Sequence, residues 1–147
     1  MKVGELIQSD KEEWSRLYHG YAEFYEMEMN EDILNTVWSW IFNPDNKFFA
    51  IGVRSNENKL IGFMHFREMP SPLRGKLVGF LDDLFVDPIY RGSGAVQLLF
   101  KELKFVAAKK NWPYVRWITA TNNSRARKVY DKLSEPIDFV TYQMPIN

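Results

Sequence analysis

The chain has 147 residues, 46% of them hydrophobic and 26% charged, so one globular domain over residues 1–147 is expected and a disordered or low-complexity chain is excluded. The absence of cysteine excludes disulfides, thiolate catalysis and cysteine-ligated metals, and two histidines leave little for any other metal site. A formal net charge of zero disfavours nucleic-acid binding by bulk electrostatics.

The two halves of the chain differ in charge. Residues 1–69 hold 12 acidic and seven basic residues, a net of −5, and residues 70–147 hold seven acidic and 12 basic residues, a net of +5. This asymmetry reflects either chance scatter or a cationic ligand on one side and an anionic ligand on the other. No apolar stretch approaches the roughly 18 residues that a membrane span requires, so we expect a cytoplasmic protein without membrane contact.

Hydrophobic periodicity predicts two helices near the amino terminus, after a short strand at residues 3–8. Ser9-Asp-Lys-Glu12 forms a capping box before the first helix. Asn30 is the expected cap of the second helix, and Asn43-Pro44 is expected to end it. The apolar stripes are Trp14, Leu17, Tyr18, Tyr21, Phe24 and Tyr25 in the first helix, and Ile33, Leu34, Val37, Trp38, Ile41 and Phe42 in the second.

The rest of the chain alternates strands with helices. Strands are expected at residues 47–53, 59–68, 76–86, 114–119 and 139–144, and helices are expected to begin near residues 95 and 124. Turn formers between the first two of these strands predict an antiparallel hairpin. The element order therefore predicts a mixed α/β (α+β) fold without internal repeats.

The segment that joins the 76–86 strand to the next helix carries the clearest chemical signal. It reads Asp87-Pro-Ile-Tyr-Arg-Gly-Ser-Gly94. A glycine-rich turn at a helix N-terminus presents unpaired backbone N–H groups and the positive end of the helix dipole, which together favour a phosphate. Taken alone, Gly92-x-Gly94 is equally consistent with a tight turn that needs glycine.

The longer stretch Val86-x-Pro-x-Tyr-Arg-Gly-x-Gly94 resembles the pyrophosphate-binding motif of the GNAT superfamily, the acetyl-CoA-dependent N-acetyltransferases. The helix Asn123-Ser-Arg-Ala-Arg-Lys-Val-Tyr130 is similar to a second signature of that superfamily, Asn-x-x-Ala-x-x-x-Tyr. The N-terminal half and Asp82-Asp83 look most like the branch that includes fungal histone and polyamine acetyltransferases and diamine acetyltransferases. The resemblance implies the GNAT fold, with a largely antiparallel sheet of six to seven strands and four helices.

This resemblance also implies where acetyl-CoA, the cosubstrate, would bind, with no metal required. Its diphosphate would lie on the backbone of residues 91–97, and its pantetheine arm would pair with residues 84–86 as an added strand does. Val96 stands where the family usually has a glycine. The implied contacts are Leu84, Phe85, Val86, Arg91, Gly92, Ser93, Gly94, Ala95, Val96, Gln97, Asn123 and Tyr130.

Tyr130 resembles the family's general acid, which protonates the departing thiolate. Asn123 serves either as a helix cap alone or also as a pantetheine contact. Asp82 is the expected base, because histone-type relatives have a glutamate where this chain has Phe80, and strand alternation puts Asp82 on the same face. That alternation places Asp83 on the opposite face, where it ties down a loop or lines the acceptor site. A water relay to Asp82 is the remaining alternative.

Glu23 and Glu26, interleaved with aromatic residues, are candidate contacts for a cationic acceptor, although a solvated acidic helix face explains them equally well. His65 is expected to be a packed core histidine. The leading hypothesis is an N-acetyltransferase that acts on a polyamine, an amino acid or another small amine, with a protein lysine ranked behind these acceptors. The alternatives are a non-catalytic acyl-CoA-binding regulator and, ranked last, a nucleic-acid-binding domain. The resemblance leaves a homodimer open.

Overall fold

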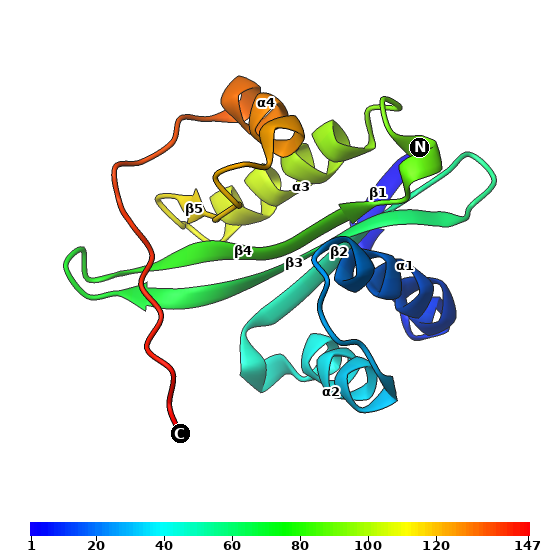
Figure 1. Ribbon diagram of the computed structural model, residues 1–147, viewed down its shortest axis with the longest axis horizontal. Helices are drawn as coiled ribbons and strands as arrows, with labels where there is room; N and C mark the ends of the chain where they lie inside the picture. Colours follow the sequence, from blue (N-terminus) through cyan, green and yellow to red (C-terminus); the bar gives the residue numbers. More distant parts are fainter. The chain divides into compact units, whose positions relative to one another are not determined.

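The computed structural model describes all residues, 1–147, and has one five-stranded sheet with the strand order β1-β2-β3-β4-β5 (Figure 1). The first four strands pair antiparallel, and β5 pairs parallel to β4. The strands are β1 (Lys2–Glu5), β2 (Phe48–Arg54), β3 (Leu60–Ser71), β4 (Lys76–Val86) and β5 (Val115–Arg116). The helices are α1 (Lys11–Phe24), α2 (Glu31–Phe42), α3 (Ala95–Lys109) and α4 (Ser124–Leu133). None of these helices is both long enough and apolar enough to span a bilayer.

Local sequence signals explain most of the helix boundaries. The Asn30 side chain accepts a hydrogen bond from the backbone N–H of Ile33 at 2.9 Å, so it caps α2 as predicted. The extended Asn43 before Pro44 ends the same helix. The start of α1 differs slightly from the prediction, because a short 3₁₀ turn over Gln8–Asp10 precedes it and Asp10 takes the cap position.

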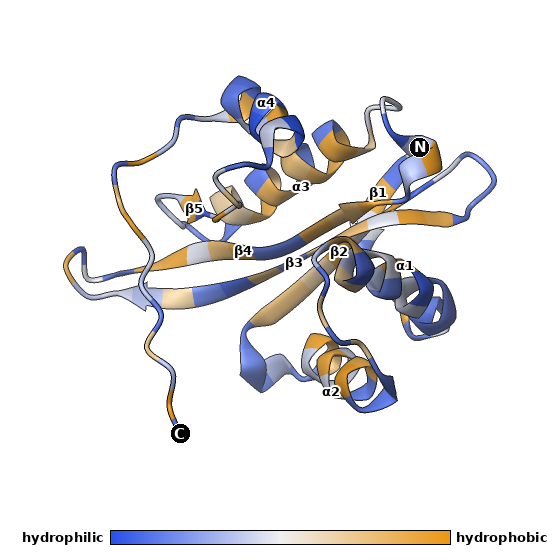
Figure 2. Ribbon diagram, in the orientation of Figure 1, coloured by the Kyte–Doolittle hydropathy of each residue, from blue (hydrophilic) through white to orange (hydrophobic).

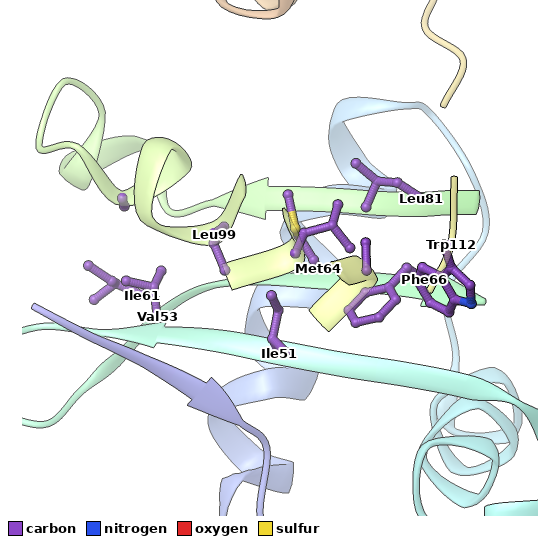
Figure 3. Close-up of a cluster of buried hydrophobic side chains, with 11 residues drawn as sticks. Ile51, Val53, Ile61, Met64, Phe66, Leu81, Leu99 and Trp112 are labelled. Carbon is purple, nitrogen blue, oxygen red and sulfur yellow. The ribbon is translucent and has the colours of Figure 1, made fainter. Parts of the chain in front are cut away.

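The sheet is buried on both faces, with α1 and α2 on one side and α3 on the other (Figure 1). Alternation along β3 divides its side chains between the two layers: Phe63 packs with α1 and α2, whereas Met64 and Phe66 pack with α3. Figure 2 shows hydrophobic residues concentrated on these strands and on the buried sides of the helices. Figure 3 shows the α3-side cluster, in which Leu99 from the helix lies with Ile51, Met64 and Leu81 from three strands.

The chain divides into two compact units, Met1–Trp117 and Ile118–Asn147. The first holds the whole sheet, the helices α1, α2 and α3, and both buried clusters. The second holds α4, whose N-terminus is capped by the Asn123 side chain through the N–H of Ala126 at 3.3 Å. The expectation of a single domain stays a prediction.

Two strand predictions need correction. The strand expected at 114–119 is limited to Val115–Arg116, and residues 139–144 form no strand. The sheet therefore has five strands instead of six to seven. Alternating apolar residues favour a strand only where a partner strand supplies backbone hydrogen bonds, and this segment has no strand partner. Its apolar side chains are largely exposed, for example Phe139 at 77% and Tyr142 at 91%.

Candidate active site

A β-bulge in β4 shapes the candidate site. His65 pairs with Asp83 while the next residue, Phe66, pairs with Leu81, so Asp82 is an extra residue without a partner on β3. Asp82 contacts Arg67 and Asp83 contacts His65, and both of these partners lie on one face of β3. Both carboxylates therefore lie on the face that α1 and α2 cover.

This arrangement corrects the prediction that Asp82 and Asp83 stand on opposite faces. Strict alternation holds only for regular strands, and one inserted residue turns the second carboxylate back to the first one's side. The predicted common face of Phe80 and Asp82 is confirmed, because Arg67 lies over the Phe80 ring at 4.9 Å and its Nη2 lies 3.1 Å from Asp82 Oδ1.

Asp83 is held by a chain of hydrogen bonds that leads into the core. Its Oδ2 lies 2.8 Å from His65 Nδ1 and accepts a hydrogen bond from the Tyr18 hydroxyl at 2.8 Å. Behind His65, the indole Nε1 of Trp14 donates to His65 Nε2 at 2.9 Å. Because an indole N–H only donates, Nε2 must accept, and the proton of a neutral His65 must lie on Nδ1, from which it is donated to Asp83.

The surroundings move the pKa values of the two neighbouring carboxyls in opposite directions. Burial raises the pKa of Asp82; Arg67 lowers it and the Asp83 charge raises it, and the net pKa lies above the usual range. Burial alone would also raise the pKa of Asp83, but the hydrogen bond and the electrostatic attraction of His65, together with hydrogen bonds from Tyr18 and Tyr21, outweigh this effect and hold its pKa below the usual range. Asp82 is therefore the better proton acceptor, and Asp83 is the more persistent anion.

The hydroxyls beside Asp83 remain protonated. Burial and the Asp83 charge raise the pKa of Tyr18 and of Tyr21 well above the ordinary phenol value. Each hydroxyl is therefore a hydrogen-bond donor to the carboxylate and not a second negative charge.

A pocket of about 560 Å³ opens onto both carboxylates. Its volume suits a small organic molecule. One side chain of α1, two of α2 and three sheet residues that carry charge line it, together with residues around the start of β2. The lining residues are Tyr18, Val37, Trp40, Asn46, Phe48, Arg67, Asp82 and Asp83. Glu23 lies in the last turn of α1 and Glu26 in the turn that follows it, and both are exposed. Neither lines this pocket, so their contact with an acceptor stays a prediction.

The predicted coenzyme loop has the backbone that a phosphate cradle needs. Gly92 and Gly94 adopt φ values of +77° and +91°, a region that favours glycine. Gly94 is the N-cap of α3 and supplies no side-chain cap, which leaves the first N–H groups of that helix for a ligand. Val96 lies within the first turn of the continuous α3 helix.

The loop is anchored to the rest of the first unit through Asp87. This buried carboxylate accepts the backbone N–H of Ile89 at 3.2 Å and pairs with Arg16 of α1 at 3.1 Å. The sequence analysis assigned no role in the site to Arg16 or Trp14. Arg16 occupies a polar position on the first helix, but only the fold places it beside Asp87, 71 residues further along the chain.

The edge of β4 next to this loop is available for pairing. The strand β5 pairs only with Gly79 and Phe80, so no strand of the Met1–Trp117 unit covers the β4 edge at Leu84, Phe85 and Val86. Their opposite edge is bonded to β3 through partners Met64, Phe63 and Gly62. An extended pantetheine arm fits such an open edge as an added strand. The loop and this edge therefore fit acetyl-CoA.

The remaining predicted residues lie in the second unit. Asn123 caps α4, and Tyr130 is a half-buried residue of that helix. Their roles toward the coenzyme stay predictions. No group of three or more His, Asp or Glu side chains is arranged to hold a metal ion.

Comparison with known proteins agrees with this geometry. The chain is 26% identical over 142 residues, 96% of its length and 88% of the relative's, to a D-amino-acid N-acetyltransferase, HPA3, of Saccharomyces cerevisiae. A solved probable acetyltransferase shares its fold with a TM-score of 0.88 at 23% identity, over 100% of this chain and 99% of the other. A solved ribosomal-protein-alanine N-acetyltransferase from Brucella melitensis biovar Abortus shares the fold with a TM-score of 0.81 at 22% identity, over 99% of this chain and 100% of the other.

These two structures show the shared fold alone, whereas the family match rests on the sequence. The model of the acetyltransferase (GNAT) family, whose members use acetyl-CoA, matches residues 10–134. That span includes the glycine-rich loop, both carboxylates of the β4 bulge and the α4 helix. The chain therefore belongs to the GNAT family of acetyltransferases.

Proposed function

We propose that this protein is an N-acetyltransferase that moves an acetyl group from acetyl-CoA to the primary amine of a small molecule by direct attack in a ternary complex. The observation that carries the proposal is the β4 bulge, which presents Asp82 and Asp83 to one pocket just before the open strand edge at Leu84–Val86. An acceptor in this pocket and a coenzyme on that edge would meet on the same strand.

Each residue in this reaction has a separate task. The acceptor arrives as an ammonium ion and must lose a proton before its nitrogen can attack. Asp82, whose pKa is raised, takes that proton directly or through one water molecule. Acetyl-CoA supplies the acetyl group as a thioester. In this proposal the backbone around Gly92 and Gly94 holds its diphosphate, and Tyr130 protonates the departing sulfur.

The acceptor class follows from the pocket and from the relatives. Aromatic side chains and carboxylates line a pocket of small-molecule size, which suits a free amine better than a folded protein's lysine. The 26% identical yeast relative is named for acetylating D-amino acids, so D- and L-amino acids belong in the first panel beside polyamines. That relative also supports placement near the fungal branch of the superfamily.

A thiol-release assay with acetyl-CoA and this panel tests the proposal. We expect release of CoA that depends on at least one small amine, together with the acetylated product by mass spectrometry. Replacing Tyr130 with Phe should lower kcat at least tenfold and weaken acetyl-CoA binding much less, since the phenol is needed chiefly when sulfur departs. Acetyl-CoA binding by calorimetry without turnover of any amine would instead support a non-catalytic acyl-CoA-binding regulator.

A further inference from the structure

His65 makes two side-chain hydrogen bonds that the packing of the core does not require. Its side chain is completely buried between Trp14 and the sheet, and both ring nitrogens are engaged. Burying an imidazole is unfavourable unless its polar atoms are satisfied, and an apolar residue would fill the same space without that requirement. The two hydrogen bonds lead in one direction, from the deep core to the Asp83 carboxylate in the pocket.

No arginine or lysine pairs with Asp83. Arg67 pairs with Asp82, whereas the partners of Asp83 are Tyr18, Tyr21 and His65, whose Nε2 accepts a hydrogen bond from Trp14. Hydrogen bonds from these donors orient the carboxylate. The two carboxylates and one guanidinium give this pocket a net charge of −1 when all three are ionised. A positively charged ligand is therefore favoured beside Asp83.

We propose that His65, held by Trp14, is a positioning residue that fixes the Asp83 carboxylate as the anchor for the ammonium group of the acceptor. This inference rests on the proposed function and adds the way in which the acceptor is bound. Trp14 holds the proton of His65 on Nδ1, His65 and Tyr18 hold Asp83 Oδ2, and the Asp83 charge faces the incoming cation. The aromatic rings of Tyr18, Trp40 and Phe48 line the space beside it.

The first test compares the acceptor KM of single and double variants. Asp83→Asn removes the anchoring charge, and His65→Phe removes the donor while keeping an aromatic ring. Each should raise the KM about ten- to hundredfold, the usual effect of losing a hydrogen bond to a charged group, with an unchanged acetyl-CoA dissociation constant. Because His65 acts through Asp83, the double variant should show no further rise. Multiplying effects in the double variant would overturn the inference.

Two variants separate positioning from stability. His65→Asn returns an N–H donor near the position of Nδ1, so its acceptor KM should lie close to the wild-type value. Leu34→Ala empties a similarly buried site in the core cluster that contains Trp14 and should lower the melting temperature without changing the acceptor KM. A KM that rises in Leu34→Ala as it does in His65→Phe would show a merely structural role and overturn the inference.

A spectroscopic test does not depend on folding of the variants. Nitrogen-15 NMR of the wild-type protein should show His65 protonated on Nδ1 and unprotonated on Nε2, with the exposed His19 removed by His19→Gln for assignment. A proton on Nε2 would overturn the inference. If the wild-type protein acetylates no amine, the proposed function is rejected and the inference with it. If it does, and the variant effects multiply, only the inference is rejected.

Discussion

Asp82 and Asp83 are neighbours of the same residue type, yet their surroundings prepare them for opposite tasks. One oxygen of Asp82 is buried without a hydrogen-bond partner, and the other pairs with a half-exposed guanidinium. Asp83 is more completely enclosed, but every hydrogen bond that reaches it favours the ionised form. Desolvation therefore decides that the pKa of Asp82 is raised, and hydrogen bonding decides that the pKa of Asp83 is lowered.

The raised pKa of Asp82 predicts where the acidic side of the pH–rate profile lies. The carboxylate accepts a proton only above its own pKa, so kcat should fall as the pH drops through that value, and Asp82→Asn should flatten this limb. Arg67 stabilises the ionised form, so Arg67→Met should move the limb to higher pH, by about one unit or less because Arg67 is half exposed. The measurement is kcat against pH at saturating amine and acetyl-CoA.

Arg74→Met is the matched control for this experiment. Arg74 lies in the β3–β4 hairpin, over the Tyr114 ring and away from the pocket lining, so its loss should leave the limb in place. An unmoved limb in Arg67→Met, or an unchanged profile in Asp82→Asn, would assign the base role to water or to another group.

At the scale of elements, the turn between β4 and α3 combines two features that favour phosphate binding. Its glycines adopt left-handed conformations, and the helix that follows begins without a side-chain cap. Both features leave backbone N–H groups accessible where the helix dipole is positive. The ion pair between Arg16 and Asp87 ties the start of this turn to α1 and so limits its movement.

Gly94→Leu tests this turn. A side chain at φ +91° is strained by about 1–2 kcal/mol and would also stand over the helix N-terminus. Gly75→Leu imposes the same type of strain at φ +62° in the β3–β4 hairpin, with nothing near its added Cβ. We expect similar losses in urea-unfolding free energy for both, but a CoA affinity at least tenfold weaker only for Gly94→Leu. Equal CoA affinity by calorimetry in the two variants would reject the cradle.

At the scale of the whole molecule, charge is distributed unevenly although it sums to zero. The half of the sequence that carries the glycine-rich loop has a net charge of +5, and the half that carries α1 and α2 has −5. Such an arrangement suits an anionic coenzyme and a cationic acceptor, because each is attracted by a different part of the chain. The homodimer and the cytoplasmic location expected from the sequence stay predictions.

This charge distribution predicts a salt dependence that is specific to the phosphate-bearing ligand. Raising NaCl from about 50 mM to about 500 mM should weaken CoA binding several-fold, because the Debye length falls well below the size of the binding region. Pantetheine lacks the phosphates, so its binding should change little. Calorimetric titrations of both ligands across this range make the comparison. A CoA affinity independent of salt would contradict a mainly electrostatic diphosphate site.

The prediction of secondary structure from sequence succeeded where the signal is local. Apolar spacing and the Asn30 cap placed the helices, and glycine at Gly92 and Gly94 marked the turn before α3, because these features depend on neighbouring residues alone. The same reasoning failed for residues 139–144, where alternation suggested a strand but a partner strand is absent.

By itself, the amino-acid sequence determined the order of the elements up to α4, the glycine-rich turn and the presence of two adjacent carboxylates. Only the tertiary structure decided that those carboxylates share one pocket, because a single extra residue in β4 changes the direction of a side chain and leaves no trace in composition or periodicity. It also decided that Trp14, His65 and Asp83 form one hydrogen-bonded chain, across separations of 51 and 18 residues. Such contacts depend on strand register and on the docking of α1, which are properties of the assembled sheet and its helices.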